Sequence, residues 1–109
     1  MKLVLAIIND EDSFTVLDAF VEKRISVTKL ASTGGFLKSG FTTLICGVDE
    51  DRVPEVIEVI EQKCKSRKHM TSASMSPMNL SDGYAPFPIE VTVGGATIFV
   101  LNVEEFKKV

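Results

Sequence analysis

Apolar positions near the start of the chain predict two elements in succession. Leu3–Ile8 is a continuous apolar run, which is typical of a central strand covered on both faces of its sheet. Asp10, Asp12 and Ser13 then offer side chains that can cap a helix and charge that favours its start. The helix predicted there is amphipathic, with an apolar stripe that faces the sheet: Phe14, Leu17, Phe20 and Val21.

From Ile25 onward the apolar period becomes two, which predicts a strand. Residues 33–40 follow and contain three glycines, and Phe41–Val48 has the pattern of a further strand. We expect these two strands to form an antiparallel hairpin with a long tip.

A second helix is predicted after the carboxylates of Asp49–Asp51, with Pro54 in its first turn, where proline is tolerated. Basic residues between Lys63 and His69 gather at its C-terminal end, where positive charge complements the helix dipole. The stripe expected to be buried is Val53, Val56, Ile57, Ile60 and Cys64.

Residues 69–88 show no clear period and are expected to form a long loop, which in compact domains is usually functional or disordered. Ile89–Val93 and Ala96–Val103 flank a Gly94-Gly95 pair, which predicts a tight hairpin. The fold class expected is therefore α+β: a ferredoxin-like βαββαβ arrangement with an extra C-terminal hairpin strand and a long loop before it. Residues 1–109 are expected to form a single domain.

Composition and charge exclude several classes of protein. The chain is 45% hydrophobic, which excludes disorder, and its formal charge of −3 argues against a duplex-DNA binder. No apolar run approaches the roughly 18 residues that a membrane-spanning helix needs. The two cysteines have no motif spacing, which suits a reducing cytosol. We expect a cytoplasmic protein with neither a nucleic acid nor a membrane as partner.

The sequence offers no set of residues for acid–base or nucleophilic catalysis. Its one histidine, His69, is interpreted as a solvated residue at the basic end of a helix. Cys46 and Cys64 lie among apolar neighbours and are interpreted as small core residues. No cysteine or carboxylate spacing matches a zinc or calcium site, so no metal, no cofactor and no enzymatic activity are expected.

The glycine-containing stretch at residues 34–40 fails the test for a phosphate-binding loop, because Leu37 precedes the lysine and a strand follows. A weaker interpretation is an anion-binding nest of backbone N–H groups beside Lys38, with Phe36 at the tip. The alternative is a flexible turn in which Phe36 folds onto the core or contacts another subunit. The residues themselves leave both open.

Two long motifs carry a resemblance to a known family. Val27–Leu37 and Val91–Leu101 are similar to signatures of the PII-like cyclic di-AMP receptor family, and the likeness extends over essentially the whole chain. The resemblance implies a PII-like, ferredoxin-like fold, a homotrimer, and a nucleotide second messenger bound in clefts between subunits.

The resemblance also implies which residues contact the ligand: Thr28, Gly35, Phe36, Leu37 and Gly47. Phe99 either lines the cleft from a neighbouring chain or packs within a strand core.

The chain departs from the family pattern at two positions, with Ser26 in place of an arginine and Phe41 in place of an asparagine. Arg24 lies on the same expected strand face as Ser26 and Thr28 and could restore the positive charge. Phe41 could add a stacking surface.

Three hypotheses follow for the function. In the first, the chain is a non-enzymatic signalling protein that binds cyclic di-AMP at trimer interfaces and signals to an unidentified protein partner by rearranging loops 34–40 and 69–88. In the second, it is a divergent paralogue that has lost cyclic di-AMP and binds another nucleotide or only a protein. In the third, it is a small ferredoxin-like enzyme that uses the cleft between subunits.

Overall fold

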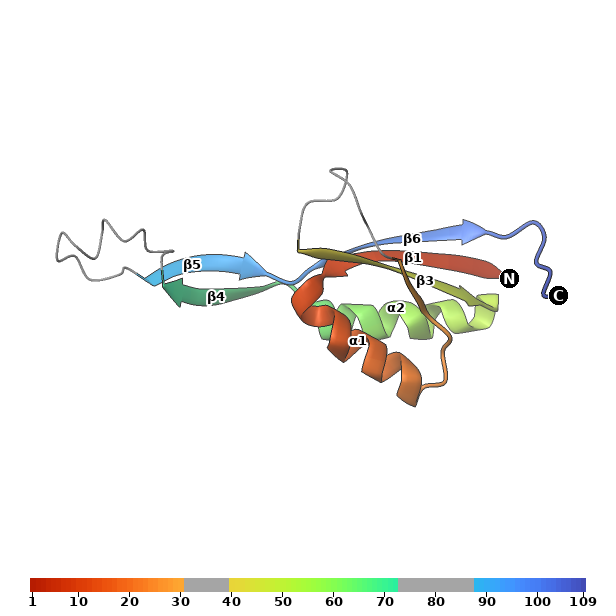
Figure 1. Ribbon diagram of the computed structural model, residues 1–109, viewed down its shortest axis with the longest axis horizontal. Helices are drawn as coiled ribbons and strands as arrows, with labels where there is room; N and C mark the ends of the chain where they lie inside the picture. The colour runs from red at the N-terminus through yellow and green to blue at the C-terminus, as the bar shows by residue number, and fades with distance from the viewer. Residues whose placement is uncertain (31–39, 73–87) are drawn as a thin grey trace.

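The computed structural model of the protein describes residues 1–30, 40–72 and 88–109. Two helices, one 3₁₀ turn and six strands make up this part of the chain (Figure 1). In chain order they are β1 (Lys2–Asn9), α1 (Asp10–Glu22), β2 (Thr28–Leu30), β3 (Phe41–Val48), the 3₁₀ turn (Glu50–Arg52), α2 (Val53–Cys64), β4 (Arg67–Ser72), β5 (Pro88–Val93) and β6 (Ala96–Asn102).

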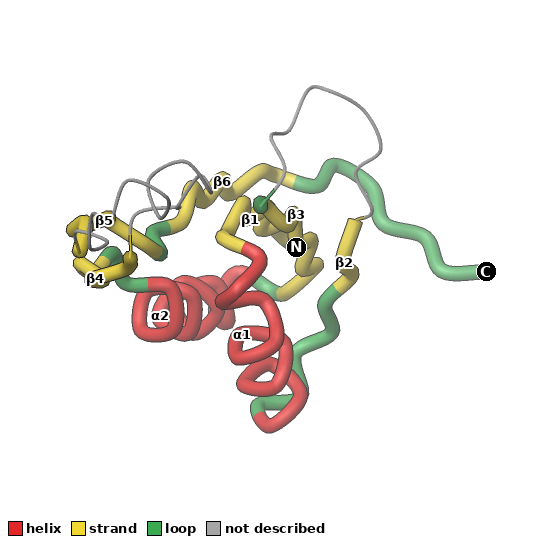
Figure 2. Tube along the Cα trace, turned by 60° about the vertical axis from the view of Figure 1, so that its left-hand side comes forward, coloured by secondary structure: helices red, strands yellow, loops and turns green. Residues whose placement is uncertain are grey.

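Four of the strands form an antiparallel sheet in the order β2-β3-β1-β6, and both helices pack on one face of it (Figures 1 and 2). This arrangement confirms the predicted α+β, ferredoxin-like βαββαβ fold. The predicted pairing of β2 with β3 is also confirmed, although β2 is only three residues long.

The core lies between the helices and one face of the sheet. Strands β1 and β3 contribute alternate residues to it, and the helices contribute the rest: Val4, Ala6, Ile8, Leu44, Cys46, Val16, Phe20, Val56, Val59, Ile60 and Cys64. Leu3, Leu5 and Ile7 point to the other face and are only half-buried. The prediction that β1 is covered on both faces is therefore wrong, because both helices lie on the same side.

The predicted apolar stripe of α1 is only partly right. Phe14 and Val21 are 81% and 71% exposed, while Ser13, Val16 and Phe20 are buried. Each residue advances an α-helix by about 100°, so Phe14 lies nearly opposite Val16. The helix therefore turns Phe14 and Val21 away from the sheet.

The helix starts also differ from the prediction. Among the described residues, neither N-cap residue, Asn9 for α1 or Asp49 for the 3₁₀ turn, makes a side-chain cap. Ser13 Oγ instead donates to the Asp10 carbonyl at 2.8 Å. The buried stripe predicted for α2 is largely confirmed, with Val59 fully buried where Ile57 was expected.

Strands β4 and β5 form a second, two-stranded sheet that extends away from the helices (Figure 1). The prediction of a loop throughout 69–88 is therefore wrong at both ends, and residues 73–87 lie outside the described part of the chain. The predicted hairpin across Gly94-Gly95 is wrong as well, because β5 pairs with β4 and β6 pairs with β1.

The two glycines connect one sheet to the other. The φ angles of Gly94 and Gly95 are +84° and +85°. Hydrogen bonds join Gly94 to the end of β1 and Gly95 to the end of α2. Asn9 Nδ2 donates to the Gly94 carbonyl at 2.9 Å, and the Gly95 N–H donates to the Cys64 carbonyl.

Neither helix in the described ranges is long and apolar enough to cross a lipid bilayer.

Gly94 and Gly95 form a matched pair for testing this connection. A Cβ on Gly94 would lie 2.7 Å from the Lys65 carbonyl oxygen, whereas a Cβ on Gly95 would have 4.0 Å to its nearest neighbour, at Ser66. Gly95→Ala should cost about 1–2 kcal/mol, because the φ angle is positive. Gly94→Ala should cost about 1–3 kcal/mol more, because the backbone must also move. Urea unfolding measures both, and an equal loss in the two variants would contradict the close approach to Lys65.

Candidate functional site

A pocket of about 490 Å³ opens at the β2–β3 end of the sheet, on the face opposite the helices. It brings together three of the residues expected to contact the ligand: Ser26, Thr28 and Gly47. The other lining residues are Met1, Val27, Ile45, Phe106, Lys107 and Lys108.

Strand register explains why these residues share the pocket. Thr28 is directly opposite Ile45, and Gly47 is two residues further along β3, so all three are on one face of the sheet. Thr28 and Gly47 are exposed. A Cβ on Gly47 would meet no atom within 4 Å, so the glycine leaves open space in the pocket.

The C-terminal segment supplies the positive charge of the pocket. After β6 the chain runs to the β2 side of the sheet (Figure 2), where Phe106, Lys107 and Lys108 join the lining. Lysine ammonium groups bind phosphate as point charges. These residues were not predicted from the sequence, where their signal is two adjacent lysines beside an aromatic residue after the last strand.

The turn from α1 into β2 positions Ser26 and Thr28. The Arg24 N–H donates to the Val21 carbonyl at 3.1 Å, and the Ile25 N–H donates to the Phe20 carbonyl at 2.9 Å. These two bonds, with Arg24 at a φ of +57°, form a Schellman motif at the helix end. Phe20 and Ile25 are both buried, which adds the hydrophobic contact usual in that motif.

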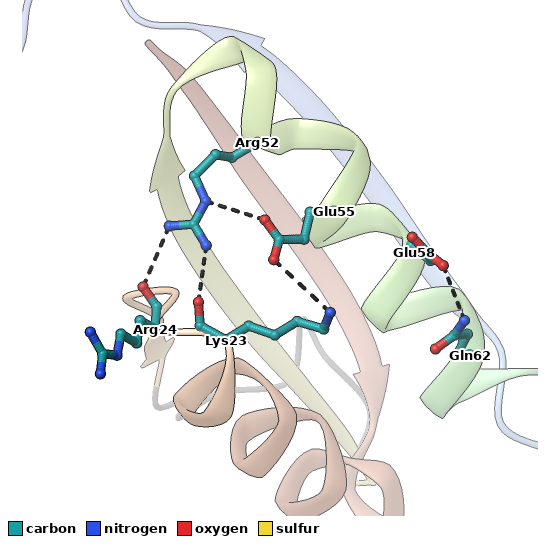
Figure 3. A network of polar contacts seen from close by, with 6 residues as sticks. All are labelled: Lys23, Arg24, Arg52, Glu55, Glu58 and Gln62. Carbon is teal, nitrogen blue, oxygen red and sulfur yellow. Dashed lines mark hydrogen bonds and ion pairs between the residues drawn. The ribbon is translucent and has the colours of Figure 1, made fainter.

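Arg52 closes the same turn from the start of α2 (Figure 3). Its Nη2 donates to the Lys23 carbonyl at 3.0 Å, its Nη1 lies 3.5 Å from the Arg24 carbonyl, and its Nε donates to Glu55 Oε2 at 3.3 Å. Lys23 Nζ is 4.0 Å from Glu55 Oε1. The guanidinium therefore satisfies carbonyls that the helix end leaves free.

The remaining predicted contact residues lie elsewhere. Arg24 belongs to the turn before β2, not to a strand face shared with Ser26, and it is not among the pocket residues. Phe41 starts β3, six positions and therefore about 20 Å from Gly47. Gly35, Phe36 and Leu37, together with Lys38, lie outside the described residues.

Phe99 is on the same sheet face as Thr28 but at the opposite edge. Register places Thr28, Ile45, Leu5 and Phe99 in one row across β2, β3, β1 and β6. Three strand spacings amount to about 14 Å, so Phe99 and Thr28 of one chain do not share a pocket. Phe99 is 51% exposed, which differs from a strand-core position.

Cys46 and Cys64 are free and buried, as predicted for small core residues. Burial raises the pKa of each thiol to about 11. For Cys64, the Asp12 carboxylate also contributes to this rise in pKa, and the Arg67 guanidinium opposes it. Both thiols are therefore protonated at neutral pH and are poor nucleophiles.

An ion pair anchors the start of β4 against α1. Arg67 Nη2 donates to Asp12 Oδ1 at 2.8 Å, and this hydrogen bond raises the pKa of Arg67. Asp12 is 4% exposed, and its Oδ2 has no hydrogen-bond partner within the described ranges.

His69 belongs to β4, so the prediction that it ends a helix is wrong.

No group of three or more histidine, cysteine, aspartate or glutamate side chains in the described part of the chain could hold a metal ion.

Comparison with known proteins assigns this architecture to a class. Residues 1–109 match the family described as "Cyclic-di-AMP receptor", so the chain belongs to the cyclic-di-AMP receptor family. Membership of this family places the protein among nucleotide-binding signalling proteins.

The chain is also similar to a solved crystal structure, a functionally unknown protein from Pediococcus pentosaceus ATCC 25745. The two are 42% identical with a TM-score of 0.75, over 99% of this chain and 96% of that chain.

Arg52→Ala should loosen the turn that carries Ser26 and Thr28. We expect the free energy of unfolding to fall by about 1 kcal/mol, because carbonyl hydrogen bonds are lost. Amide hydrogen exchange over residues 24–28 should become faster. Glu58→Ala is the matched control, since Glu58 Oε1 accepts a hydrogen bond from Gln62 of the same helix, at 3.2 Å, and from no other residue in the described ranges (Figure 3). Equal exchange in the two variants would contradict a positioning role for Arg52.

Proposed function

We propose that this protein is a non-enzymatic, cytoplasmic receptor that binds cyclic di-AMP at the interfaces of a homotrimer. The observation that carries the proposal is the pocket where Ser26, Thr28 and Gly47 meet Lys107 and Lys108. Family membership supports a nucleotide as the ligand, and the pocket has groups suited to one.

The chemistry of the pocket fits a phosphodiester joined to an aromatic base. Lys107 and Lys108 offer ammonium groups to phosphate oxygens, and the Thr28 hydroxyl can donate or accept a hydrogen bond. Phe106 is exposed and can stack on adenine. The whole chain carries a charge of −3, so attraction of an anionic ligand depends on these local cations.

The trimer is supported by surfaces that one chain leaves uncovered. The face of the sheet opposite the helices presents exposed Leu30, Phe99 and Leu101, and half-buried Leu3 and Leu5. Strands β2 and β6 are both edges of that sheet, and an exposed edge can pair with another chain. Different edges that meet head to tail generate a closed ring when the rotation closes.

Such a ring would complete the ligand site. Phe99 is about 14 Å across the sheet from Thr28 in one chain, but β6 of a neighbour placed beside β2 would bring a second Phe99 to the pocket. In this proposal ligand binding rearranges residues 34–40 and the segment between β4 and β5 at the interface, and a protein partner recognises the rearranged surface.

The second candidate is a divergent paralogue that keeps the fold but has lost cyclic di-AMP. Ser26 and Phe41 favour it, because the family pattern has arginine and asparagine there. The lysines of the C-terminal segment oppose it, since they return positive charge to the pocket that Ser26 lines.

Isothermal titration calorimetry separates the two candidates. The full chain should bind cyclic di-AMP with micromolar or tighter affinity and more strongly than cyclic di-GMP, ATP or cAMP. Lys107→Ala combined with Lys108→Ala should weaken binding by about 10- to 100-fold, because charge-assisted hydrogen bonds are lost. Lys63→Ala with Lys65→Ala removes the same charge at the far end of α2 and should leave affinity unchanged.

If the chain binds another nucleotide but not cyclic di-AMP, the second candidate, a divergent paralogue, is established instead. Binding to none of the four would refute a receptor for these nucleotides.

Restoring the family residues tests the positions at which the chain departs from the pattern. Ser26→Arg with Phe41→Asn should raise the affinity for cyclic di-AMP at least tenfold, because an arginine donates charge-assisted hydrogen bonds to phosphate. Each single variant measured beside the double variant shows whether the pocket residue or the residue about 20 Å along β3 makes the gain. Unchanged affinity in all three would mean that the ligand lies elsewhere.

A further inference from the structure

Helix α1 carries an apolar stripe on its solvent side. Phe14, Leu17 and Val21 are spaced at i, i+3 and i+7, which aligns them along one side of the helix. Phe14 and Val21 are largely exposed, and Leu17 is half-buried at the boundary with the core. We call these three residues the outer stripe. Val16 and Phe20 already bury the sheet-facing side of the same helix, so packing in the core accounts for Leu17 in part but not for Phe14 or Val21.

A row of carboxylates runs beside the outer stripe. Glu11, Asp18 and Glu22 are exposed and lie about 40–80° around the helix from Phe14. No basic residue is present within α1. The apolar side chains therefore border a strongly negative surface.

The negative charge is concentrated in the helices. Together α1 and α2 contain eight carboxylates and one lysine, a formal charge of −7. The whole chain carries −3, so all the other residues together carry +4. The helices therefore carry a net negative charge, with Lys23 and Arg52 at their ends, and the cationic pocket lies outside them.

The outer stripe and the pocket lie on opposite sides of the sheet. Figures 1 and 2 show both helices on one face, and Thr28 and Gly47 point to the other. The sheet face with its exposed leucines and Phe99 is also directed away from α1. A molecule bound to the outer stripe would therefore compete neither with a ligand in the pocket nor with contacts across the open sheet face.

We propose that the outer stripe of α1 docks a basic amphipathic helix of a protein partner. Apolar anchors at i, i+3 and i+7 are the spacing by which two helices recognise each other along one face. The carboxylates select for lysine or arginine beside the partner's apolar residues. They disfavour a nucleic acid or an anionic membrane by repulsion, and they disfavour α1 of a second copy for the same reason.

The proposal adds a partner surface to the proposed receptor, but it rests only on the exposure and charge of α1. It is therefore tested without nucleotide. The probe is a fluorescent synthetic helical peptide with leucines at i, i+3 and i+7 and lysines on both flanks. A peptide of the same composition in scrambled order and a peptide with glutamates in place of the lysines are the comparisons, and fluorescence anisotropy measures binding to the full chain.

The wild-type chain should bind the basic helical peptide at least tenfold more tightly than the scrambled one, and salt should weaken that binding. Phe14→Ser with Val21→Ser should reduce the affinity at least tenfold without lowering the melting temperature, because both side chains are largely exposed. Glu11→Lys with Asp18→Lys should lose the basic peptide and gain the glutamate peptide.

Glu104→Lys with Glu105→Lys is the control for charge. It makes the same change in net charge at exposed positions after β6, and it should retain binding of the basic peptide within twofold.

Equal binding of the scrambled peptide, or an equal loss in the Glu104/Glu105 control, would refute a specific surface on α1. A change of oligomeric mass in the Phe14/Val21 variant by analytical ultracentrifugation would assign the stripe to a second copy and overturn the proposal. Nucleotide binding is measured separately, so the peptide-binding results can still be interpreted if the receptor proposal fails.

Discussion

Two helices cover one face of a four-stranded sheet, and most other features of the protein depend on that one-sided packing. Phe20, Val16 and Ile60 fill the space above Val4, Ala6 and Ile8, and this burial supplies the main hydrophobic stabilisation of the body. The same strands carry apolar residues on the opposite face, where no helix lies. The open face leaves room for a pocket at the β2 edge, reached by the C-terminal segment, and for contacts with further chains.

Polar contacts then hold the segments that extend from the two helices and the four-stranded sheet. Arg52 holds the turn before β2 through the carbonyls of Lys23 and Arg24, while Arg67 pairs with the buried carboxylate of Asp12 at the start of β4. At the end of β5, the partner strand of β4, the Gly94 carbonyl accepts a hydrogen bond from Asn9. Each contact joins residues far apart in the sequence, so loss of a partner would free a whole segment and not just one side chain.

The local pattern of apolar and polar residues predicted the helices and most strands well, but it predicted less well which side of a helix faces the core. Phe41–Val48 is a strand with the predicted bounds, because its apolar and β-branched residues favour that conformation. The stripe of α1 was misassigned, because Phe14 and Val21 are as apolar as the residues that are buried and periodicity alone does not say which side meets the sheet. Strand β4 was missed because Arg67–Ser72 is largely polar and its partner strand, β5, begins more than fifteen residues away in the sequence.

The amino-acid sequence by itself determined the fold class, the family and the absence of a recognisable catalytic motif, because these depend on local periodicity and on motifs contiguous in the chain. It also indicated Ser26, Thr28 and Gly47 through the resemblance. Tertiary structure alone decided that Lys107 and Lys108 reach those residues, that Phe99 lies across the sheet from them, and that Phe14 faces solvent. The physical reason is that strand register and helix rotation are set by packing between distant segments, which no local pattern encodes.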